Sequence, residues 1–162
     1  MNEISEGARV SSLADIEESH RGNKVIVQAG AVLDSFVKIK FSGGTGNIVI
    51  GKNTVINSGC VIYSGNGVAI GAGVAIAANC TLAPVNHEVG DRNLPFRSQG
   101  FSTSKGGIII EDDVWIGAGC TLLDGSILRR GCVVGAMSLV RGELPEFSIF
   151  GGNPLREIGH RK

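Results

Sequence analysis

A histidine in a long polar segment is the first residue whose type and position suggest chemistry. His87 lies five residues after Leu82, where a run of regularly spaced aliphatic residues stops, and the run restarts only near Ile108. Loops of this length in compact domains are usually functional or disordered. Imidazole exchanges protons near neutral pH, so His87, with Asn86 beside it, is a candidate general base. The alternative is an ordinary histidine of a surface loop.

The four cysteines are predicted to be structural. Each one lies four residues after an aliphatic residue of the repeat, at a small inward-facing position; they are Cys60, Cys80, Cys120 and Cys132. At such positions cysteine behaves as a small buried hydrophobe. A zinc site would need closely spaced ligand pairs such as C-x₂-C, and the sequence has none. We therefore expect no metal site and no cysteine nucleophile.

The elements that position His87 are encoded by a repeat of six residues. Between residues 108 and 140 an aliphatic residue returns at every sixth position: Ile110, Ile116, Leu122, Leu128, Val134 and Val140. The same spacing runs through residues 50–82, with a two-residue slip at Asn66-Gly67. A period of six fits neither an α-helix nor a half-buried strand. It is typical of a parallel β-helix, in which three short strands and three corners form one coil.

The repeat also suggests how the chain is divided. We expect an all-β protein in which residues 25–142 form the β-helix and a long loop, residues 83–107, is inserted between coils. Residues 143–162 are expected to form a C-terminal turn and a basic tail. Residues 1–24 lie outside the recognised repeat, and a sequence like a capping box predicts a short helix or loop at Ser12–Ser19 that covers the open end.

Composition excludes several classes of protein. The 162 residues carry no formal net charge, which gives no indication of nucleic-acid binding. No apolar run is long enough to span a bilayer, and the N-terminus lacks the apolar core of a signal peptide, so a cytoplasmic protein is expected. The 25 glycines suit many sharp corners, and the low aromatic content of 5% suits a narrow interior.

These motifs together resemble a known family. The hexads, the Asn86-His87 loop, the segments VWIGAG (114–119) and VGAMSLV (134–140), and the ending Gly152-Asn153-Pro154 are similar to those of the hexapeptide-repeat acyltransferases. The similarity is greatest to sugar O-acetyltransferases of the maltose, galactoside, capsule and O-antigen types. The resemblance covers roughly residues 46–158. It implies a left-handed parallel β-helix and a homotrimer, with acetyl-CoA lying in the groove between two subunits.

The resemblance also assigns roles on the acceptor side of the site. His87 stands where the family has its catalytic histidine, and Asn57 matches an asparagine held near the reacting groups. Asn86 is included as a substrate-binding candidate. The residue that orients His87 is not identified by the sequence; Glu88 and Asp91 are near it only in sequence, and either would be the next candidate base.

On the cofactor side, Trp115 matches the family's V-W-I-G tryptophan, and Ala118 and Ala136 match positions that meet the pantetheine arm. Arg156 matches a basic residue that reaches the CoA phosphates. Arg141 lies one position before the place of a family lysine that is missing here, and is included as a candidate. Two alternatives remain open: Trp115 packs only at a subunit interface, and Arg156 is a solvated tail charge.

The function implied by the resemblance is acetyl-CoA-dependent O-acetylation of a hydroxyl group on a sugar or polysaccharide precursor. Direct transfer is expected, because every cysteine is assigned to the core. The first alternative is N-acetylation of a nucleotide-linked amino sugar, and the second is a non-catalytic β-helix platform. A γ-class carbonic anhydrase would need three histidines at one zinc site. Here His20 and His160 lie before and after the regular coils, which disfavours that function.

Overall fold

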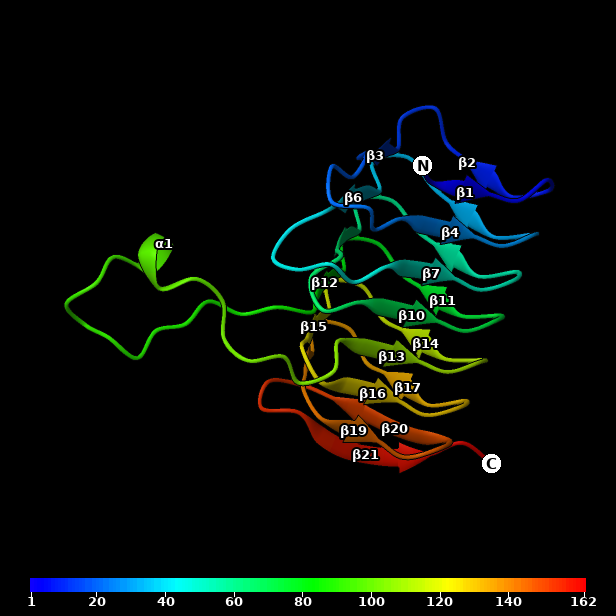
Figure 1. The fold of residues 1–162 in the computed structure, drawn as a ribbon. Helices are drawn as coiled ribbons and strands as arrows, with labels where there is room; N and C mark the ends of the chain where they lie inside the picture. Colours follow the sequence, from blue (N-terminus) through cyan, green and yellow to red (C-terminus); the bar gives the residue numbers. More distant parts are fainter.

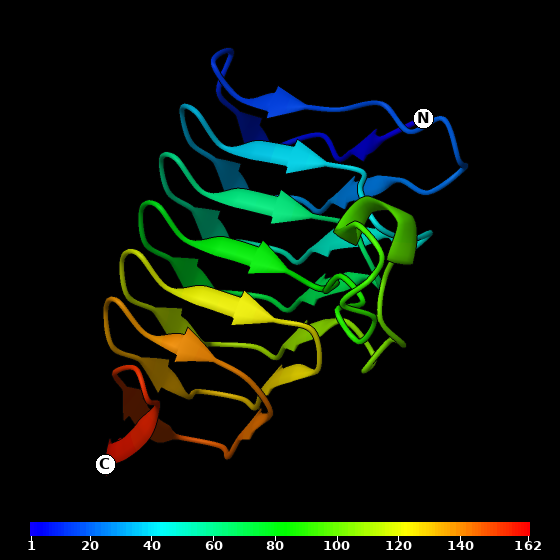
Figure 2. The same cartoon turned by 90° about the vertical axis from the view of Figure 1, so that its left-hand side faces the viewer.

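The computed structural model describes residues 1–162 and shows short strands that wind around a single core (Figure 1). Successive coils stack from the N-terminus to the C-terminus, and the winding is left-handed (Figure 2). The prediction of an all-β, left-handed parallel β-helix is therefore confirmed. The only helix, α1 (Phe96–Gln99), lies in the inserted loop. With four residues, it is far too short to cross a membrane, and no other helix exists that could.

The strands form three sheets, one for each face of the coil. Sheet A contains β1 (Glu3–Ile4), β4 (Val25–Val27), β7 (Ile48–Ile50), β10 (Val68–Ile70), β13 (Ile108–Ile110), β16 (Ser126–Leu128) and β19 (Glu143–Leu144). Sheet B contains β2 (Arg9–Val10), β5 (Val32–Leu33), β8 (Val55–Ile56), β11 (Ala75–Ile76), β14 (Trp115–Ile116), β17 (Val133–Val134), β20 (Ser148–Gly151) and β21 (Arg156–His160). Sheet C contains β3 (Asp15–Ile16), β6 (Lys38–Lys40), β9 (Val61–Tyr63), β12 (Thr81–Ala83), β15 (Thr121–Leu123) and β18 (Leu139–Val140). All neighbours pair in parallel except β20 and β21, which are antiparallel.

The aliphatic residues of the hexads fill the interior. In sheet A, for example, Ile50, Ile70 and Ile110 are directly in register and all are buried. Fully burying an aliphatic side chain of this size contributes roughly 1.5–3 kcal/mol. The four cysteines are also buried and carry free thiols, as predicted. Continuous columns of aliphatic side chains along the axis therefore hold each coil to the next.

Two of the three corners are tight and uniform. At the corner between sheets B and C, one residue in each coil after the first has a left-handed backbone: Phe36, Gly59, Asn79, Gly119 and Met137. The corner between sheets A and B has the same arrangement at Gly30, Asn53, Gly73, Asp113 and Gly131. Glycine and asparagine adopt this conformation at low cost, which explains much of the glycine content. We name these the B–C corner and the A–B corner.

The third corner, between sheets C and A, has a variable length. It takes residues 17–24 in the first coil and 41–47 in the second. After β12 it takes residues 84–107, the predicted loop without Ala83, and these residues extend far from the solenoid (Figure 1). After β15, by contrast, only Asp124 and Gly125 separate two strands. Every interruption of the sequence repeat therefore falls at one edge, which we name the C–A corner.

The N-terminal segment differs from expectation. Residues 1–24 contain β1, β2 and β3, which pair with the strands of the second coil, so they form a coil of the same solenoid. The predicted short helix or loop at Ser12–Ser19 is replaced by a corner and β3. The backbone of this segment bonds to free groups of the second coil, as in Ser11 N–H to Leu33 O at 2.9 Å, and these bonds outweigh a local cap. The six-residue spacing of Ile4, Val10 and Ile16 was the signal for it.

The C-terminal segment also contains more regular structure than expected. Strands β19 and β20 extend sheets A and B, and a turn after Gly151 leads into β21, which folds back on β20. Arg161 then contacts the A–B corner, where its Nη1 lies 2.9 Å from Asp113 Oδ2 and 3.0 Å from Gly131 O. The tail is therefore attached to the solenoid along its length.

Candidate functional site

His87 lies at the base of the inserted loop, and its ring is held from one side. Its Nδ1 is 3.2 Å from the carbonyl oxygen of Gly100, and its ring centroid is 4.9 Å from that of Phe101. Because a carbonyl oxygen can only accept, the facing nitrogen carries the hydrogen. Nε2 is then left with a free lone pair on an exposed side chain. In the neutral ring, this is the tautomer that a general base acting through Nε2 requires.

The two stems of the loop pair with each other around His87. His87 and Phe101 form an isolated antiparallel bridge. Glu88 N–H donates to Gly100 O at 3.1 Å, and Ser102 N–H donates to Asn86 O at 2.9 Å. The backbone of His87 is therefore fixed by the returning stem, although the loop beyond it extends into solvent.

The neighbouring acidic residues do not orient the histidine. The Glu88 carboxylate accepts the backbone N–H groups of Val89 and Gly90 at 2.8 and 2.9 Å. The Asp91 carboxylate accepts the N–H of Asn93 at 2.9 Å. Both carboxylates stabilise turns of the loop, and the contact with His87 is made instead by the Gly100 carbonyl.

A buried carboxylate holds the root of the loop. Asp124, in the tight C–A corner after β15, accepts the N–H groups of Lys105 and Gly107, each at 2.8 Å. Its Oδ2 also accepts Nδ2 of Asn66 at 3.1 Å. The backbone N–H of Asn66 in turn donates to Pro84 O in the outgoing stem at 3.1 Å. Asn66 and Asp124 thus connect both stems to the solenoid.

Asn57, expected on the acceptor side, and the two alanines expected near the acyl donor lie at a different edge, the B–C corner. Asn57, Gly117 and Gly135 occupy one column of this corner, since the strands before them are in register. Ala118 and Ala136 follow in the next column, one coil apart, and both are exposed. Asn57 Nδ2 donates to Ile76 O at 2.9 Å, which leaves its second amide hydrogen and its carbonyl oxygen available.

Trp115 lies on sheet B beside this corner. The two candidate arginines lie at the C-terminal end, Arg141 in the C–A corner after β18 and Arg156 opposite Gly151 at the end of β20. Trp115 projects from β14 in sheet B and is 51% exposed. Arg141 lines a cavity of about 440 Å³ at the end of the solenoid, together with Asn153, Pro154 and Leu155. Arg156 begins β21 and is exposed. Neither arginine forms an ion pair within the chain.

Within one chain the structure does not bring the two groups together. His87 and Asn86 emerge from the C–A corner, whereas Asn57, Ala118 and Ala136 lie at the B–C corner. These corners are the opposite edges of sheet C (Figure 2). A strand of three residues alone spans roughly 10 Å. The predicted residues therefore form two half-sites rather than one closed site.

Reasoning from the sequence missed several polar residues of these half-sites. Asp124 and Asn66 at the loop root were not singled out, nor was Asp34 at the B–C corner. A signal existed for Asp124, because a carboxylate beside glycine in a two-residue corner can accept backbone N–H groups. For Asp34 the signal is its alignment with Asn57, which becomes visible only when the register of the irregular second coil is known.

The thiols are poorly placed for nucleophilic chemistry, because all four are buried, including Cys60, whose pKa is lowered by its hydrogen bond with Cys80. Burial, followed by the nearby Glu111 carboxylate, raises the pKa of Cys132 to about 11. A hydrogen bond with Cys80 and burial raise the pKa of Cys120. Because the thiolate is the nucleophilic form, these cysteines stay unreactive near neutral pH.

Comparison with known families identifies the repeat. The model described as "Bacterial transferase hexapeptide (six repeats)" matches residues 107–142, and "Hexapeptide repeat of succinyl-transferase" matches residues 47–84. The two matches lie on either side of the inserted loop and cover the regular coils. The regular coils on both sides of the loop are therefore similar to those of hexapeptide-repeat transferases.

Individual relatives match only part of the chain. The chain is 35% identical to "Probable acetyltransferase Rv3034c" of Mycobacterium tuberculosis over 83 residues, which is 51% of this chain and 27% of that protein. It is also 39% identical to mitochondrial gamma carbonic anhydrase 2 of Arabidopsis thaliana over 59 residues, 35% of this chain and 21% of that protein. The chain spans about a quarter of the length of these relatives. The repeat is therefore shared by proteins whose names describe different activities.

Solved structures cover more of the chain. AntD, an N-acyltransferase from Bacillus cereus crystallised with dTDP and coenzyme A, superposes with a TM-score of 0.83 at 21% identity, covering 99% of this chain and 84% of AntD. A hexapeptide-repeat acetyltransferase from Vibrio cholerae, complexed with acetyl coenzyme A, gives 0.69 at 28% identity, covering 82% and 68%. A maltose O-acetyltransferase from Clostridium difficile gives 0.58 at 22% identity, covering 82% and 70%.

Proposed function

We propose that this protein is an acetyl-CoA-dependent O-acetyltransferase that acts on a hydroxyl group of a sugar, with His87 as general base. The observation that carries the proposal is the geometry of His87. Its Nδ1 faces the Gly100 carbonyl, so Nε2 is free to accept a proton, and the ring stands exposed on a loop inserted between hexapeptide coils. The solved Vibrio relative with acetyl coenzyme A supports the choice of donor.

The proposed reaction is a direct transfer. The acceptor oxygen attacks the thioester carbonyl carbon while His87 Nε2 takes the hydroxyl proton. The carbon–sulfur bond then breaks, and the imidazolium returns the proton to the CoA thiolate. Such a base is typically worth roughly 10²–10⁴-fold in rate. The raised pKa values of Cys120 and Cys132 support this route over an acyl-enzyme.

The oxyanion of the tetrahedral intermediate needs a hydrogen-bond donor. The free amide hydrogen of Asn57 is one candidate, since only one is used by Ile76 O. Backbone N–H groups of the adjoining coil are the other. Donors of this kind, fixed before the reaction, often contribute the largest single catalytic effect.

We propose that the donor lies along the B–C corner. At Ala118 and Ala136 only a methyl group projects, so a narrow, flexible arm such as pantetheine can lie against the backbone. Trp115 borders this path on sheet B. The free guanidinium group of Arg156, opposite the end of β20, can meet the phosphates, because Arg matches phosphate geometry with paired hydrogen bonds. Arg141 lies in the C–A corner, so we assign it to the donor bound at the corner of a neighbouring chain.

A homotrimer would complete the site. His87 and the B–C corner lie on opposite edges of sheet C, so a loop from one chain must meet the corner of another. Closed rotational symmetry repeats such a head-to-tail contact until every half-site is used. The resemblance to hexapeptide-repeat acyltransferases supports three copies.

N-acylation of a nucleotide-linked amino sugar is the second candidate. The observation that favours it is the similarity to AntD over 99% of this chain, because AntD is an N-acyltransferase crystallised with dTDP. The two reactions use the same donor and differ in the attacking atom. A non-catalytic platform is a third possibility, and carbonic anhydrase a remote fourth, since His160 is engaged with Glu157 on β21.

The decisive experiment follows release of CoA thiol from acetyl-CoA in the presence of individual sugars and nucleotide-linked amino sugars. Product analysis by mass spectrometry and alkaline hydrolysis separates an ester from an amide, because only the ester is readily cleaved. Thiol release that depends on a sugar and yields an ester supports the proposal. An amide product would establish the second candidate, and absence of acetyl-CoA binding would exclude both.

A further inference from the structure

The B–C corner changes chemistry along the solenoid axis. In its first column, Ser11, Asp34 and Asn57 of coils one to three are followed by Ala77, Gly117 and Gly135 of coils four to six. In its second column, Ser12, Ser35 and Ser58 are followed by Ala78, Ala118 and Ala136. Along the solenoid axis, six polar residues are thus followed by six residues that have no polar side-chain atom. A role in turning the chain does not explain this division, because both halves form the same corner.

The polar half is an organised network. Asp34 Oδ1 accepts the N–H of Ser35 at 2.7 Å, and Asp34 Oδ2 accepts the hydroxyl of Ser58 from the next coil at 2.8 Å. The hydroxyls of Ser11 and Ser35 lie 3.0 Å apart. The Ser35 and Ser58 hydrogen bonds lower the pKa of Asp34, so its carboxylate is charged near neutral pH.

The Asp34 carboxylate can accept further hydrogen bonds. A carboxylate offers about four acceptor positions, and the protein fills two of those on Asp34. Arg9 lies near but forms no ion pair with it. Asp34 and Arg9 also line a depression of about 490 Å³ formed by residues 8–11 and 32–34 of sheet B. Phe36, 60% exposed, borders the same corner and supplies an apolar surface.

We propose that the polar half of the B–C corner, centred on Asp34 and Ser58, is the subsite that binds hydroxyl groups of the acceptor. Sugar hydroxyls would donate to the free positions of Asp34 and exchange hydrogen bonds with the serines, and one face of the ring would pack on Phe36. Asn57 is the last polar residue of the first column and is followed there by Ala77. A hydroxyl bound at Asn57 is therefore next to the path assigned to the acyl donor. This inference rests on the proposed function, because that function places the acyl donor along the half of the corner that contains Ala118 and Ala136.

The test uses two variants and one matched control in the full-length protein. Asp34→Asn removes the charge, and Ser58→Ala removes the hydroxyl that orients it. Asp112→Asn is the control, because Asp112 accepts the Ala72 N–H at 2.7 Å on the A–B corner, away from the proposed subsite. Binding of glucose, galactose, maltose and N-acetylglucosamine is measured by saturation-transfer NMR in the presence of coenzyme A. Acetyl-CoA binding is measured by calorimetry.

We expect sugar binding to weaken at least tenfold in Asp34→Asn and Ser58→Ala, with acetyl-CoA binding, elution volume and the Asp112→Asn control unchanged. In steady-state assays the same variants should raise the KM for the sugar and not that for acetyl-CoA. Equal sugar binding in wild type and Asp34→Asn, the same loss in Asp112→Asn, or no binding of any of these sugars to the wild type overturns the subsite. Failure of the proposed function looks different: the wild type would not bind acetyl-CoA or release thiol, whatever its sugar binding.

Discussion

At the scale of single residues, the environment of His87 leads to a sharp prediction for His87→Ala. The side chain is exposed and outside the core, so its loss leaves no cavity, and stability should change by less than about 0.5 kcal/mol. Turnover should fall by roughly 10²–10⁴-fold, with acetyl-CoA binding retained.

A folded His87→Ala variant that binds acetyl-CoA and keeps near wild-type turnover would refute the assignment. Glu88→Gln is a useful companion variant, because its carboxylate caps loop turns and does not contact the ring. We expect Glu88→Gln to retain near wild-type turnover. Steady-state kinetics measures both variants.

The sequence was sufficient to select His87 as the candidate base but not to orient it. The hexad pattern located the end of the regular coils, and His87 followed directly. The carbonyl that fixes its ring belongs to Gly100, thirteen residues away, and backbone carbonyls leave no trace in residue types. The same limit applies to Asp34, whose partner Ser58 lies one coil further along the chain.

At the scale of elements, the inserted loop depends on its root. Asp124→Ala removes the acceptor for Lys105 N–H, Gly107 N–H and Asn66 Nδ2, of which the Gly107 N–H is buried and would be left unpaired. An unpaired buried donor costs roughly 1–3 kcal/mol, so we expect a destabilised loop stem and a lower kcat. Amide hydrogen exchange should accelerate at residues 100–107 and remain unchanged in sheet B.

Asp124→Asn serves as the graded control, because one amide oxygen can still accept. Its exchange rates should fall between those of the wild type and Asp124→Ala. Unchanged exchange at residues 100–107 in Asp124→Ala would show that the loop is held by other contacts. Equal acceleration throughout the solenoid would indicate a general loss of stability instead.

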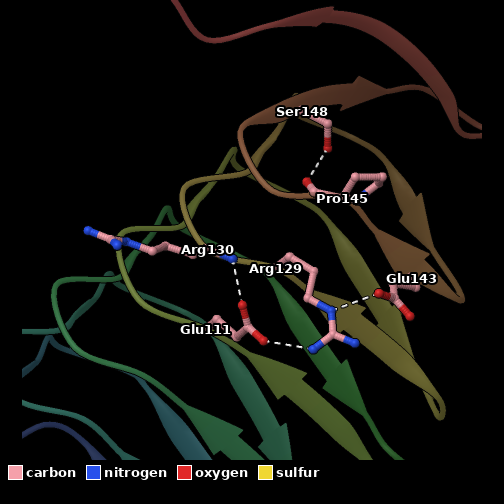
Figure 3. A network of polar contacts seen from close by, with 6 residues as sticks. All are labelled: Glu111, Arg129, Arg130, Glu143, Pro145 and Ser148. Carbon is pink, nitrogen blue, oxygen red and sulfur yellow. Dashed lines mark hydrogen bonds and ion pairs between the residues drawn. The ribbon is translucent and has the colours of Figure 1, made fainter.

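A second element-scale prediction concerns the ion network on the last coils (Figure 3). Arg129 lies between Glu111 and Glu143, at 2.8 and 2.7 Å, and Arg130 N–H donates to Glu111 at 2.8 Å. The hydrogen bonds from Arg129 and Arg130 lower the pKa of Glu111. A carboxylate with a lowered folded-state pKa contributes stability above its unfolded pKa, near about 4.5, and loses it as pH falls through the folded value.

Glu111→Gln should therefore reduce the free energy of unfolding by about 1 kcal/mol at pH 7, as exposed networks do. The difference from the wild type should shrink as pH falls below about 4.5. Urea unfolding at several pH values measures this. A difference that stays constant down to the most acidic pH would mean that the charge of Glu111 is not involved.

The sequence predicted the regular elements well and the terminal ones poorly. Where hexads follow one another without interruption, the buried columns are determined by spacing alone, and the strands lie as expected. In residues 1–24 the aliphatic residues are the same distance apart, but serines and charged residues between them suggested a cap. The edge of the second coil supplies the hydrogen-bond partners that decide the outcome, and a local pattern cannot show them.

At the scale of the whole molecule, two half-sites on opposite edges predict complementation between inactive chains. His87→Ala removes the base, and Ala118→Phe obstructs the exposed corner, so each variant alone should be inactive. Co-expressed chains should recover activity, since roughly a quarter of interfaces in randomly mixed assemblies combine an intact loop with an intact corner. Thiol release from co-expressed and separately purified variants measures this.

Light scattering should report three chains per particle for wild type and mixture alike. Absence of recovery in verified mixed assemblies would mean that each site is built within one chain. A monomeric wild type with full activity would remove the inter-chain site altogether. Sequence alone could not reveal this dependence, because hexads describe one solenoid and not where its edges meet a neighbour.

The confinement of every change in length to the C–A corner has a consequence for how such proteins diversify. Segments of 8, 7 and 24 residues, at positions 17–24, 41–47 and 84–107, connect sheet C to sheet A without disturbing the stacking of coils. Mutational insertions at this edge therefore meet little selection against them, whereas a single inserted residue at either tight corner would shift every later side chain out of the core. Descendants can exchange loops here and acquire new acceptors while keeping one scaffold. A laboratory peptide tag placed beside the exposed Thr45 would exploit the same tolerance.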